Sequence, residues 1–310
     1  MNNLITDIKS LEIETLKNLK NSKAHNTLRA YQADFNDFSS FCVKNGFSSL
    51  PTQPKIIALY ITNLSKYSKF STLKRRIASI SVIHKLKGHY LDTKHPVIME
   101  NLYGIKRTLG SRQKSKKPIL INDLKLIIKA IDEEKKQIKG KEKDKFRNKA
   151  LILIGFAGGF RRSELVDIEY EDIEFVAEGV KILIKRSKTD QSGEGAIKAI
   201  PYFDNKEFCP VLALKKYIDC EFKLKKSKVF NISDKSVALI LKRYAVKAGL
   251  DGSRYAGHSL RSGFATTAAE FGVEERNIMA MTGHKTTQMV RRYIQEANLF
   301  KNNALNKIKI

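Results

Sequence analysis

The chain has 310 residues, which is long enough for two domains that each bury a sizeable core. It has 58 lysine and arginine residues against 32 aspartate and glutamate residues, so its formal net charge is +26 at pH 7. Such a charge sets the chain apart from an ordinary enzyme and favours a polyanionic partner, most commonly DNA or RNA. A membrane-surface protein or a ribosomal protein is the alternative that charge alone leaves open.

No apolar run approaches the length of a spanning helix, and no signal-peptide pattern opens the chain. Cys42, Cys209 and Cys220 are odd in number and widely spaced, so neither a disulfide framework nor a zinc site is predicted. We therefore expect a folded protein in a reducing cytoplasm.

The first third of the chain is predicted to be helical throughout. Residues up to about 25 favour one weakly amphipathic helix, and apolar residues then recur at helical spacing up to Gly46. Further helices are predicted after Pro54, from Ser71 and from residues 96 to 107. The helix from Ser71 carries basic residues on its outer face that are predicted to contact DNA phosphates, namely Lys74, Arg75 and Arg76. A solvated polar face explains any one such helix equally well.

A basic linker follows. Residues 106–118 combine lysine and arginine with glycine and serine, and no acid interrupts them. Four of these residues are predicted to contact DNA: Arg112, Lys114, Lys116 and Lys117. The predicted domains are a helical domain at residues 1–108, a linker at 109–118 and a second domain with a C-terminal tail at 119–310.

The second domain is predicted to be mainly α-helical with a small antiparallel β-sheet. Helices are expected from about Asn122 and over residues 144–156, where the second helix runs into Gly158-Gly159 and a new helix that carries Glu164. Residues 170–203 change to a period of two, which predicts three strands. Lys188 lies on the turn between the last two strands, although Lys181, Lys185 and Lys198 flank the same sheet.

Groups that could bind and cleave a phosphodiester gather in residues 257–294. His258, Arg261, His284 and Tyr293 lie here in a helical context. Arginine forks and imidazoles are the groups with which a site without metal would stabilise a pentacoordinate phosphate. A tyrosine beside them could replace a DNA oxygen on phosphorus. This pattern indicates DNA strand transfer through a phosphotyrosine.

These motifs resemble those of the tyrosine recombinases, the phage-integrase family. Gly159-Phe160-Arg161-Arg162-Ser163-Glu164-Leu165 resembles the first arginine box of that family, and His258-Ser259-Leu260-Arg261 resembles its His-x-x-Arg box. Gly283-His284 and Arg292-Tyr293 resemble its last histidine and its nucleophile. No single box is specific, but together they stand in the family's order and spacing. The N-terminal helices, with Thr27-Leu28-Arg29-Ala30-Tyr31, are similar to its SAM-like core-binding domain.

The resemblance implies a role for each matching residue. Tyr293 would be the nucleophile, and Arg161 and Arg261 would hold the non-bridging phosphate oxygens. Lys188 would be the general acid that protonates the leaving 5′ oxygen. His258 would be the acid–base partner of the tyrosine.

Two further positions match the family. His284 would donate a hydrogen bond to the phosphate, and Glu164 would support the site from behind. Arg162 stands where many family members have an aliphatic or small residue, so either arginine of the pair could face the phosphate. We prefer Arg161, because Glu164 and Leu165 then fall into register.

The resemblance also implies partners. These are double-stranded DNA and a homotetramer on paired sites, with the tail after Asn298 docked on a neighbouring subunit and with room for an accessory directionality factor. Neither a metal nor a nucleotide cofactor is implied, and no membrane partner. The family's N-terminal arm-binding domain is expected to be absent, because the core-binding pattern begins almost at once.

The sequence also leaves open ordinary structural roles for single residues and several rival functions. Taken alone, Tyr293 would be an ordinary core tyrosine and His258 an ordinary helix-terminal histidine. A DNA-binding protein of the same fold that no longer cuts, a metal-dependent nuclease or transposase, and a type IB topoisomerase are the rival functions. Scattered acids disfavour the metal-dependent enzyme, and a topoisomerase would need no defined site.

Overall fold

The computed structural model describes residues 25–110, 116–134, 141–185, 195–220, 227–297 and 304–308, together with residues 10, 11 and 14. The chain divides into two compact units, Met1–Lys114 and Ser115–Ile310. The division falls inside the linker predicted for residues 109–118. The helix predicted before residue 25 lies almost wholly outside the described residues. None of the helices formed by described residues has an apolar stretch that would reach across a lipid bilayer.

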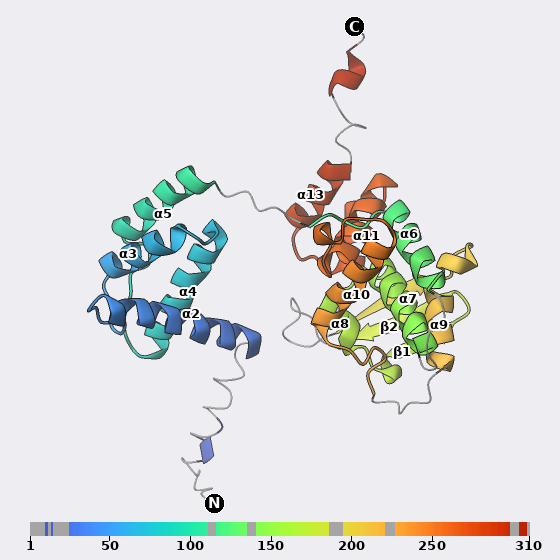
Figure 1. Cartoon of the computed structure of the whole chain (residues 1–310), viewed down its shortest axis with the longest axis horizontal. Helices are drawn as coiled ribbons and strands as arrows, with labels where there is room; N and C mark the ends of the chain where they lie inside the picture. The colour runs from blue at the N-terminus through green and yellow to red at the C-terminus, as the bar shows by residue number, and fades with distance from the viewer. Residues whose placement is uncertain are drawn as a thin grey trace, which may run out of the picture. The chain divides into compact units, whose positions relative to one another are not determined.

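The first unit contains four described helices (Figure 1), α2 (His25–Lys44), α3 (Pro54–Ser65), α4 (Phe70–Leu86) and α5 (Pro96–Leu109). Proline stands in the first turn of α3 and of α5, where its missing N–H costs no hydrogen bond. The helices bury one apolar cluster that includes Phe38, Ile57, Tyr60, Ile61, Leu64, Leu73, Ile80 and Ile98. The helical pattern predicted from the sequence is therefore confirmed here.

A buried carboxylate ties α2 to α4. Asp34 is 3% exposed, and it accepts a hydrogen bond from Ser79 Oγ at 2.7 Å and forms ion pairs with Arg75 and Arg76. Arg76 also lies 2.6 Å from Asp37, and its side chain is only 18% exposed. Arg76 thus faces the interior of the unit. The helical spacing predicts instead that it faces the solvent, so that prediction is wrong for this side chain. Burying Asp34 requires such partners, because an unpaired buried charge is costly.

The second unit is mixed. Its helices are α6 (Ile121–Asp132), α7 (Lys141–Ala157), α8 (Arg162–Asp167), α9 (Pro210–Asp219), α10 (Asp234–Lys247), α11 (His258–Glu270), α12 (Glu275–Thr282) and α13 (Thr287–Ala297), with short 3-10 turns η1 (Tyr170–Asp172), η2 (Lys206–Phe208), η3 (Gly252–Arg254) and η4 (Ala304–Lys307). Figure 1 shows α7 beside α9 and α13 beside α11, and α11 also packs on α7. The C-terminal half of α7 is buried as its apolar composition predicts.

The sheet has three antiparallel strands in the order β1 (Ile173–Val176), β2 (Gly179–Ile184) and β3 (Ala196–Pro201). Its inward positions on β2 are Val180, Ile182 and Ile184, as the alternation predicts. On β3 the inward positions are Lys198 and Ile200, opposite Ile182 and Val180. The predicted fold class, mainly α with a small antiparallel sheet, is confirmed. A lysine at an inward position of that sheet was not predicted.

The segment that enters the second unit lies directly on α11. Lys117 N donates to Arg254 O at 2.8 Å, and Ile119 N donates to Ser259 O at 3.0 Å. Gly263 permits this approach, because a Cβ at that position would lie 2.1 Å from Ile119 O. Residues 116–119 are thereby held against the helix that carries His258 and Arg261.

We predict that Gly263→Ala destabilises the protein. The added Cβ would lie 2.1 Å from a backbone oxygen, so either α11 or residues 116–119 must shift. Overpacking of this kind costs about 1–3 kcal/mol, which outweighs the ~1 kcal/mol that alanine gains over glycine inside a helix. The measurement is the thermal or urea unfolding of the variant against the parent protein.

Gly104→Ala is the matched control. Gly104 is also helical, but no atom lies within 4 Å of the position of its Cβ. This substitution should leave stability unchanged or raise it by up to ~1 kcal/mol. A Gly263→Ala protein that unfolds at or above the parent's midpoint would show that residues 116–119 do not lie against α11.

Candidate active site

Arg161 lies at a tight turn between α7 and α8. Gly159 has φ of 54°, a left-handed conformation that glycine adopts without strain. Glu164, which is 5% exposed, accepts hydrogen bonds from Arg161 N at 2.9 Å and from Arg161 Nη1 at 2.5 Å. Arg161 Nη2 donates to Gly283 O at 3.0 Å. The guanidinium is thus held from two sides, and the second contact joins its turn to the segment that carries His284.

Arg162 points elsewhere. A Cβ added to Gly257 would lie only 1.9 Å from Arg162 Cδ. The aliphatic part of the Arg162 side chain therefore packs against the start of α11. Its Nη2 lies 3.9 Å from Asp234. Arg162 is absent from the lining of the cavity that Arg161 lines. Of the two arginines in the box, the structure therefore places Arg161 at the cavity.

Arg261, in the first turn of α11, is almost completely buried, with 1% of its surface exposed. Its Nη1 donates to Gly159 O at 2.9 Å, so it is anchored on the turn that carries Arg161. Burial and the neighbouring charge of Arg161 lower the pKa of Arg261 to about 10, and Glu164 opposes that shift. An anion placed between the two arginines would offset the electrostatic repulsion between their guanidinium groups.

These groups open into one cavity of about 650 Å³. Its described lining residues are Lys116, Pro118, Arg161, His258, Ser259, Arg261, Ser262, His284, Lys285, Thr286, Met289, Arg292 and Tyr293. Five of them are lysine or arginine, and none of the described lining residues is acidic. The cavity is therefore suited to an anion such as a backbone phosphate.

Tyr293 reaches this cavity from α13. The helix packs on α11 through a small apolar cluster that includes Ala265, Ile278 and Val290, and Tyr293 lies against that cluster. The ring centroid of Tyr293 lies 6.1 Å from that of His284. The tyrosine predicted as nucleophile and both predicted arginines thus share one cavity within a single unit.

His284 follows the left-handed Gly283, which ends α12 with φ of 63°. Its Nδ1 lies 2.7 Å from Thr282 Oγ1, which is fully buried. Thr282 Oγ1 also lies 2.6 Å from Ile278 O, which can only accept. A hydroxyl has one hydrogen, and here Ile278 O takes it, so the hydrogen between Thr282 and His284 belongs to Nδ1. In its neutral form His284 therefore has an unprotonated Nε2.

Both histidines are neutral at pH 7. Burial, followed by the charges of Arg261 and Arg161, lowers the pKa of His284 to about 4. The same causes lower the pKa of His258, which occupies the first turn of α11. A neutral imidazole can accept a proton from a phenol. His284 Nε2, by contrast, could donate to a phosphate only after its ring takes up a proton.

The structure separates the lysines that flank the sheet. Lys188, the predicted general acid, lies outside the described residues. Lys181 is exposed on β2 and lies 3.6 Å from Glu174. Lys198 is buried on β3.

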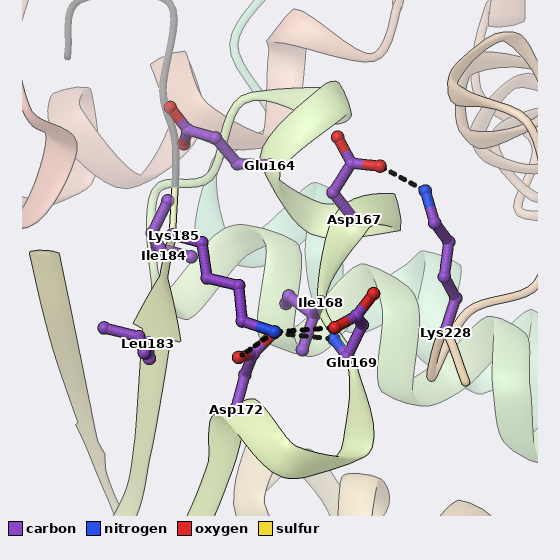
Figure 2. Close-up of a pocket in the computed structure, with 9 residues that line it drawn as sticks. All are labelled: Glu164, Asp167, Ile168, Glu169, Asp172, Leu183, Ile184, Lys185 and Lys228. Atoms are coloured by element: carbon purple, nitrogen blue, oxygen red, sulfur yellow. Dashed lines mark hydrogen bonds and ion pairs between the residues drawn. The ribbon is translucent and has the colours of Figure 1, made fainter. Parts of the chain in front are cut away.

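Lys185 is held by carboxylates in a second pocket of about 270 Å³ between α8, η1 and β2. Figure 2 shows its ammonium pointing at Glu169 and Asp172. The ammonium lies 2.6 Å from Glu169, 2.7 Å from Glu171 and 3.0 Å from Asp172. These contacts, with Glu169 first, raise the pKa of Lys185. None of the described residues of this pocket lines the active-site cavity. Lys185 is thus occupied away from the cavity.

The predicted DNA contacts have different surroundings. Arg112 and Lys114 lie outside the described residues, and Lys74 is exposed on α4. Arg75 and Arg76 are paired with Asp34, as described above. Lys116 lines the cavity and donates to Ser253 O at 2.6 Å. Lys117 donates to Asp123 at 2.8 Å, and Asp123 raises its pKa.

Sequence reasoning did not identify Thr282 as part of the site. A threonine beside a glycine and a histidine carries no signal of its own, since its role comes from the helix turn that brings Ile278 O to its hydroxyl. Lys198 was noted only as one of several lysines around the sheet. Its place in the alternation with Ile200 was the one signal that could have shown that it points inward.

We predict that Thr282 determines the tautomer of His284. In the natural protein, ¹⁵N NMR of the imidazole should show the hydrogen on Nδ1 and a titration midpoint near 4, because the pKa is lowered to about 4. Thr282→Val removes the acceptor and should shift the ring toward the Nε2–H form. Thr282→Ser keeps the hydroxyl and is the matched control. A valine variant with the natural tautomer ratio would contradict the assignment.

Comparisons with known proteins agree with this geometry. The family model described as "Phage integrase family" matches residues 117–299. An integrase/recombinase xerD homologue from Selenomonas ruminantium is 42% identical, over 96% of this chain and 89% of its own length.

Two solved structures share the fold. A lambda integrase (75–356) dimer bound to a COC′ core site has a TM-score of 0.60 at 18% identity and covers 97% of this chain and 98% of its own. A lambda integrase tetramer bound to a Holliday junction has a TM-score of 0.54 at 16% identity, covering 93% of this chain and 75% of its own. The family model spans more than half of the chain and includes every residue that lines the cavity except Lys116. The chain therefore belongs to the phage-integrase family and is a tyrosine-type site-specific DNA recombinase.

Proposed function

We propose that this chain breaks and rejoins DNA at defined sites through a covalent bond between Tyr293 and a 3′ phosphate. The observation that supports the proposal most directly is the shared cavity of Arg161, Arg261 and Tyr293. Residues from three separate parts of the chain meet in this cavity. The described residues that line it are cationic or neutral.

The chemistry follows from the groups present. Tyr293 Oη attacks phosphorus, a P–O bond to the Tyr293 oxygen forms, and the bond from phosphorus to the 5′ oxygen breaks. His258, neutral at pH 7, accepts the phenol's proton, and Lys188 gives a proton to the leaving 5′ oxygen. A 5′ hydroxyl from another strand then attacks the phosphotyrosine and reverses these steps. The ester conserves the energy of the broken bond, so the reaction needs neither a nucleotide nor a metal.

Arg161 and Arg261 act on the charge of the transition state. Each would hold a non-bridging oxygen, and each preorganised donor contributes roughly 3–4 kcal/mol, by analogy with a lost oxyanion-hole contact. Glu164 keeps Arg161 in place through the two hydrogen bonds described above. Since an unperturbed phenol has a pKa of about 10, this cationic surrounding is also what would make Tyr293 reactive near neutral pH.

The partners proposed are double-stranded DNA and further copies of this chain. The net charge of +26 supports a DNA partner, and the similarity to a lambda integrase tetramer bound to a Holliday junction supports a tetramer on paired sites. The reaction would take place in the cytoplasm, on the nucleoid. Docking of the tail after Asn298 on a neighbouring subunit stays a prediction, because most of that tail lies outside the described residues.

We predict that Tyr293→Phe binds DNA and forms no covalent adduct. The natural protein is incubated with sheared chromosomal DNA without added metal and with EDTA, and adducts are trapped with SDS and sequenced to recover the site. Tyr293→Phe should bind a duplex of that site with similar affinity, because only one hydroxyl is lost, while its adduct band disappears.

Tyr202→Phe is the control, since Tyr202 belongs to the same unit but does not line the cavity. It should form adducts as the natural protein does. Adducts in Tyr293→Phe would show that another residue is the nucleophile, and loss of adducts in EDTA would indicate a metal-dependent reaction. Relaxation of plasmids that lack the site would favour a topoisomerase.

A further inference from the structure

Lys198 occupies an inward position of β3, where the alternation of the strand predicts an apolar residue. It stands on β3 opposite Ile182 and two residues before the buried Ile200. It is 7% exposed, whereas its neighbour Ile197 on the outer face is 68% exposed. Burying an ammonium in place of an aliphatic side chain is unfavourable unless its hydrogens find partners. The contacts of Lys198 are therefore informative.

The Lys198 ammonium joins the ends of two helices. Its Nζ donates to Gly158 O at 2.6 Å and to Met281 O at 2.7 Å, and it lies 4.4 Å from the centre of the Phe160 ring. Gly158 directly follows α7, and Met281 is in the last turn of α12. Carbonyls at helix C-termini lack intrahelical partners and carry partial negative charge, so a cation fits between them.

Both helix ends lead directly into the active site. Three residues after Gly158 comes Arg161, and three residues after Met281 comes His284. The same two turns are linked a second time by the hydrogen bond from Arg161 Nη2 to Gly283 O. Lys198 thus bridges the two turns from the side of the sheet, and it is not among the described residues that line the cavity.

The charges around Lys198 support a role tied to the site. Burial lowers the pKa of Lys198 to about 7, Arg261 and Arg161 act in the same direction, and Glu164 opposes them. The ammonium therefore belongs to the same electrostatic cluster as the two arginines that would hold the phosphate. The position carries a lysine although an apolar side chain would avoid this cost.

We infer that Lys198 is a positioning residue, whose ammonium ties the Arg161 turn to the His284 turn and so determines the spacing between the groups that hold the phosphate. The inference rests on the proposed function for its catalytic consequence. Its structural half, the link between the two turns, stands independently of it. Lys198 does not touch the reacting atoms and is not a proton donor in this assignment.

The experiment compares Lys198→Met, Lys198→Arg and Lys198→Gln with Lys181→Met as the matched control. Lys181 lies on the same sheet but is exposed and paired with Glu174. The probe is a nicked duplex of the recovered site, which traps the covalent adduct when the short cleaved strand leaves. The adduct rate at saturating DNA, the DNA dissociation constant and the ¹⁵N resonances of His284 without DNA are measured for each protein.

Lys198→Met should slow adduct formation roughly 10- to 100-fold, as expected for a small misplacement of catalytic groups, while DNA affinity changes little. Lys198→Arg retains the charge and the donors and should recover part of the rate. Lys198→Gln should have a rate between those of the Met and Arg variants. The His284 resonances should move in Lys198→Met and stay unchanged in Lys181→Met.

Other outcomes overturn the inference. A Lys198→Met protein with the natural rate and unchanged His284 resonances contradicts it. Equal losses of rate and of thermal stability in Met, Arg and Gln variants would assign Lys198 to fold stability alone. If even the natural protein forms no adduct while the His284 resonances still move in Lys198→Met, the proposed function fails and the link between the turns holds.

Discussion

The site depends on holding two guanidinium groups close together before any anion is bound. Arg161 and Arg261 repel each other, and the fold offsets that repulsion with one buried carboxylate, Glu164, and with two backbone carbonyls, those of Gly159 and Gly283. Neutral carbonyls fix the position of a cation without cancelling its charge. The arginines therefore stay rigid and remain attractive to phosphate, which is the arrangement that preorganised electrostatic catalysis requires.

The rest of the second unit serves this arrangement. The turn after α7, the first turn of α11 and the end of α12 converge because α11 packs on α7 and on α12 through small, aliphatic and aromatic residues. Glycine is needed at Gly263, where a Cβ would meet a backbone oxygen, and at Gly159, whose backbone is left-handed. Lys198 of the sheet donates hydrogen bonds to the ends of α7 and α12. Helix α13 places Tyr293 in the cavity. The side chains that line the cavity come from distant parts of the sequence and are thus fixed by helix ends more than by side-chain pairs.

Much of this could be predicted from the sequence. The order of the boxes identified Arg161, His258, Arg261, His284 and Tyr293, all of which line one cavity, and the change from helical to alternating periodicity located the sheet. What the patterns could not show were partners set by tertiary contact. The spacing of Arg76 on α4 predicts an outward side chain, because that spacing carries no information about Asp34 on another helix. The tautomer of His284 and the acceptors of Lys198 depend on backbone carbonyls, which no side-chain pattern records.

The close contact between residues 116–119 and α11 affects how the protein can be divided. The sequence places the start of the second domain at residue 119, but Lys116 and Pro118 form part of the cavity wall. A fragment that begins at the predicted boundary would lack part of the wall of this cavity and would leave Ser253 O without the Lys116 hydrogen bond. Dissection of the protein into independent pieces should therefore keep residues 116–118 with the C-terminal portion.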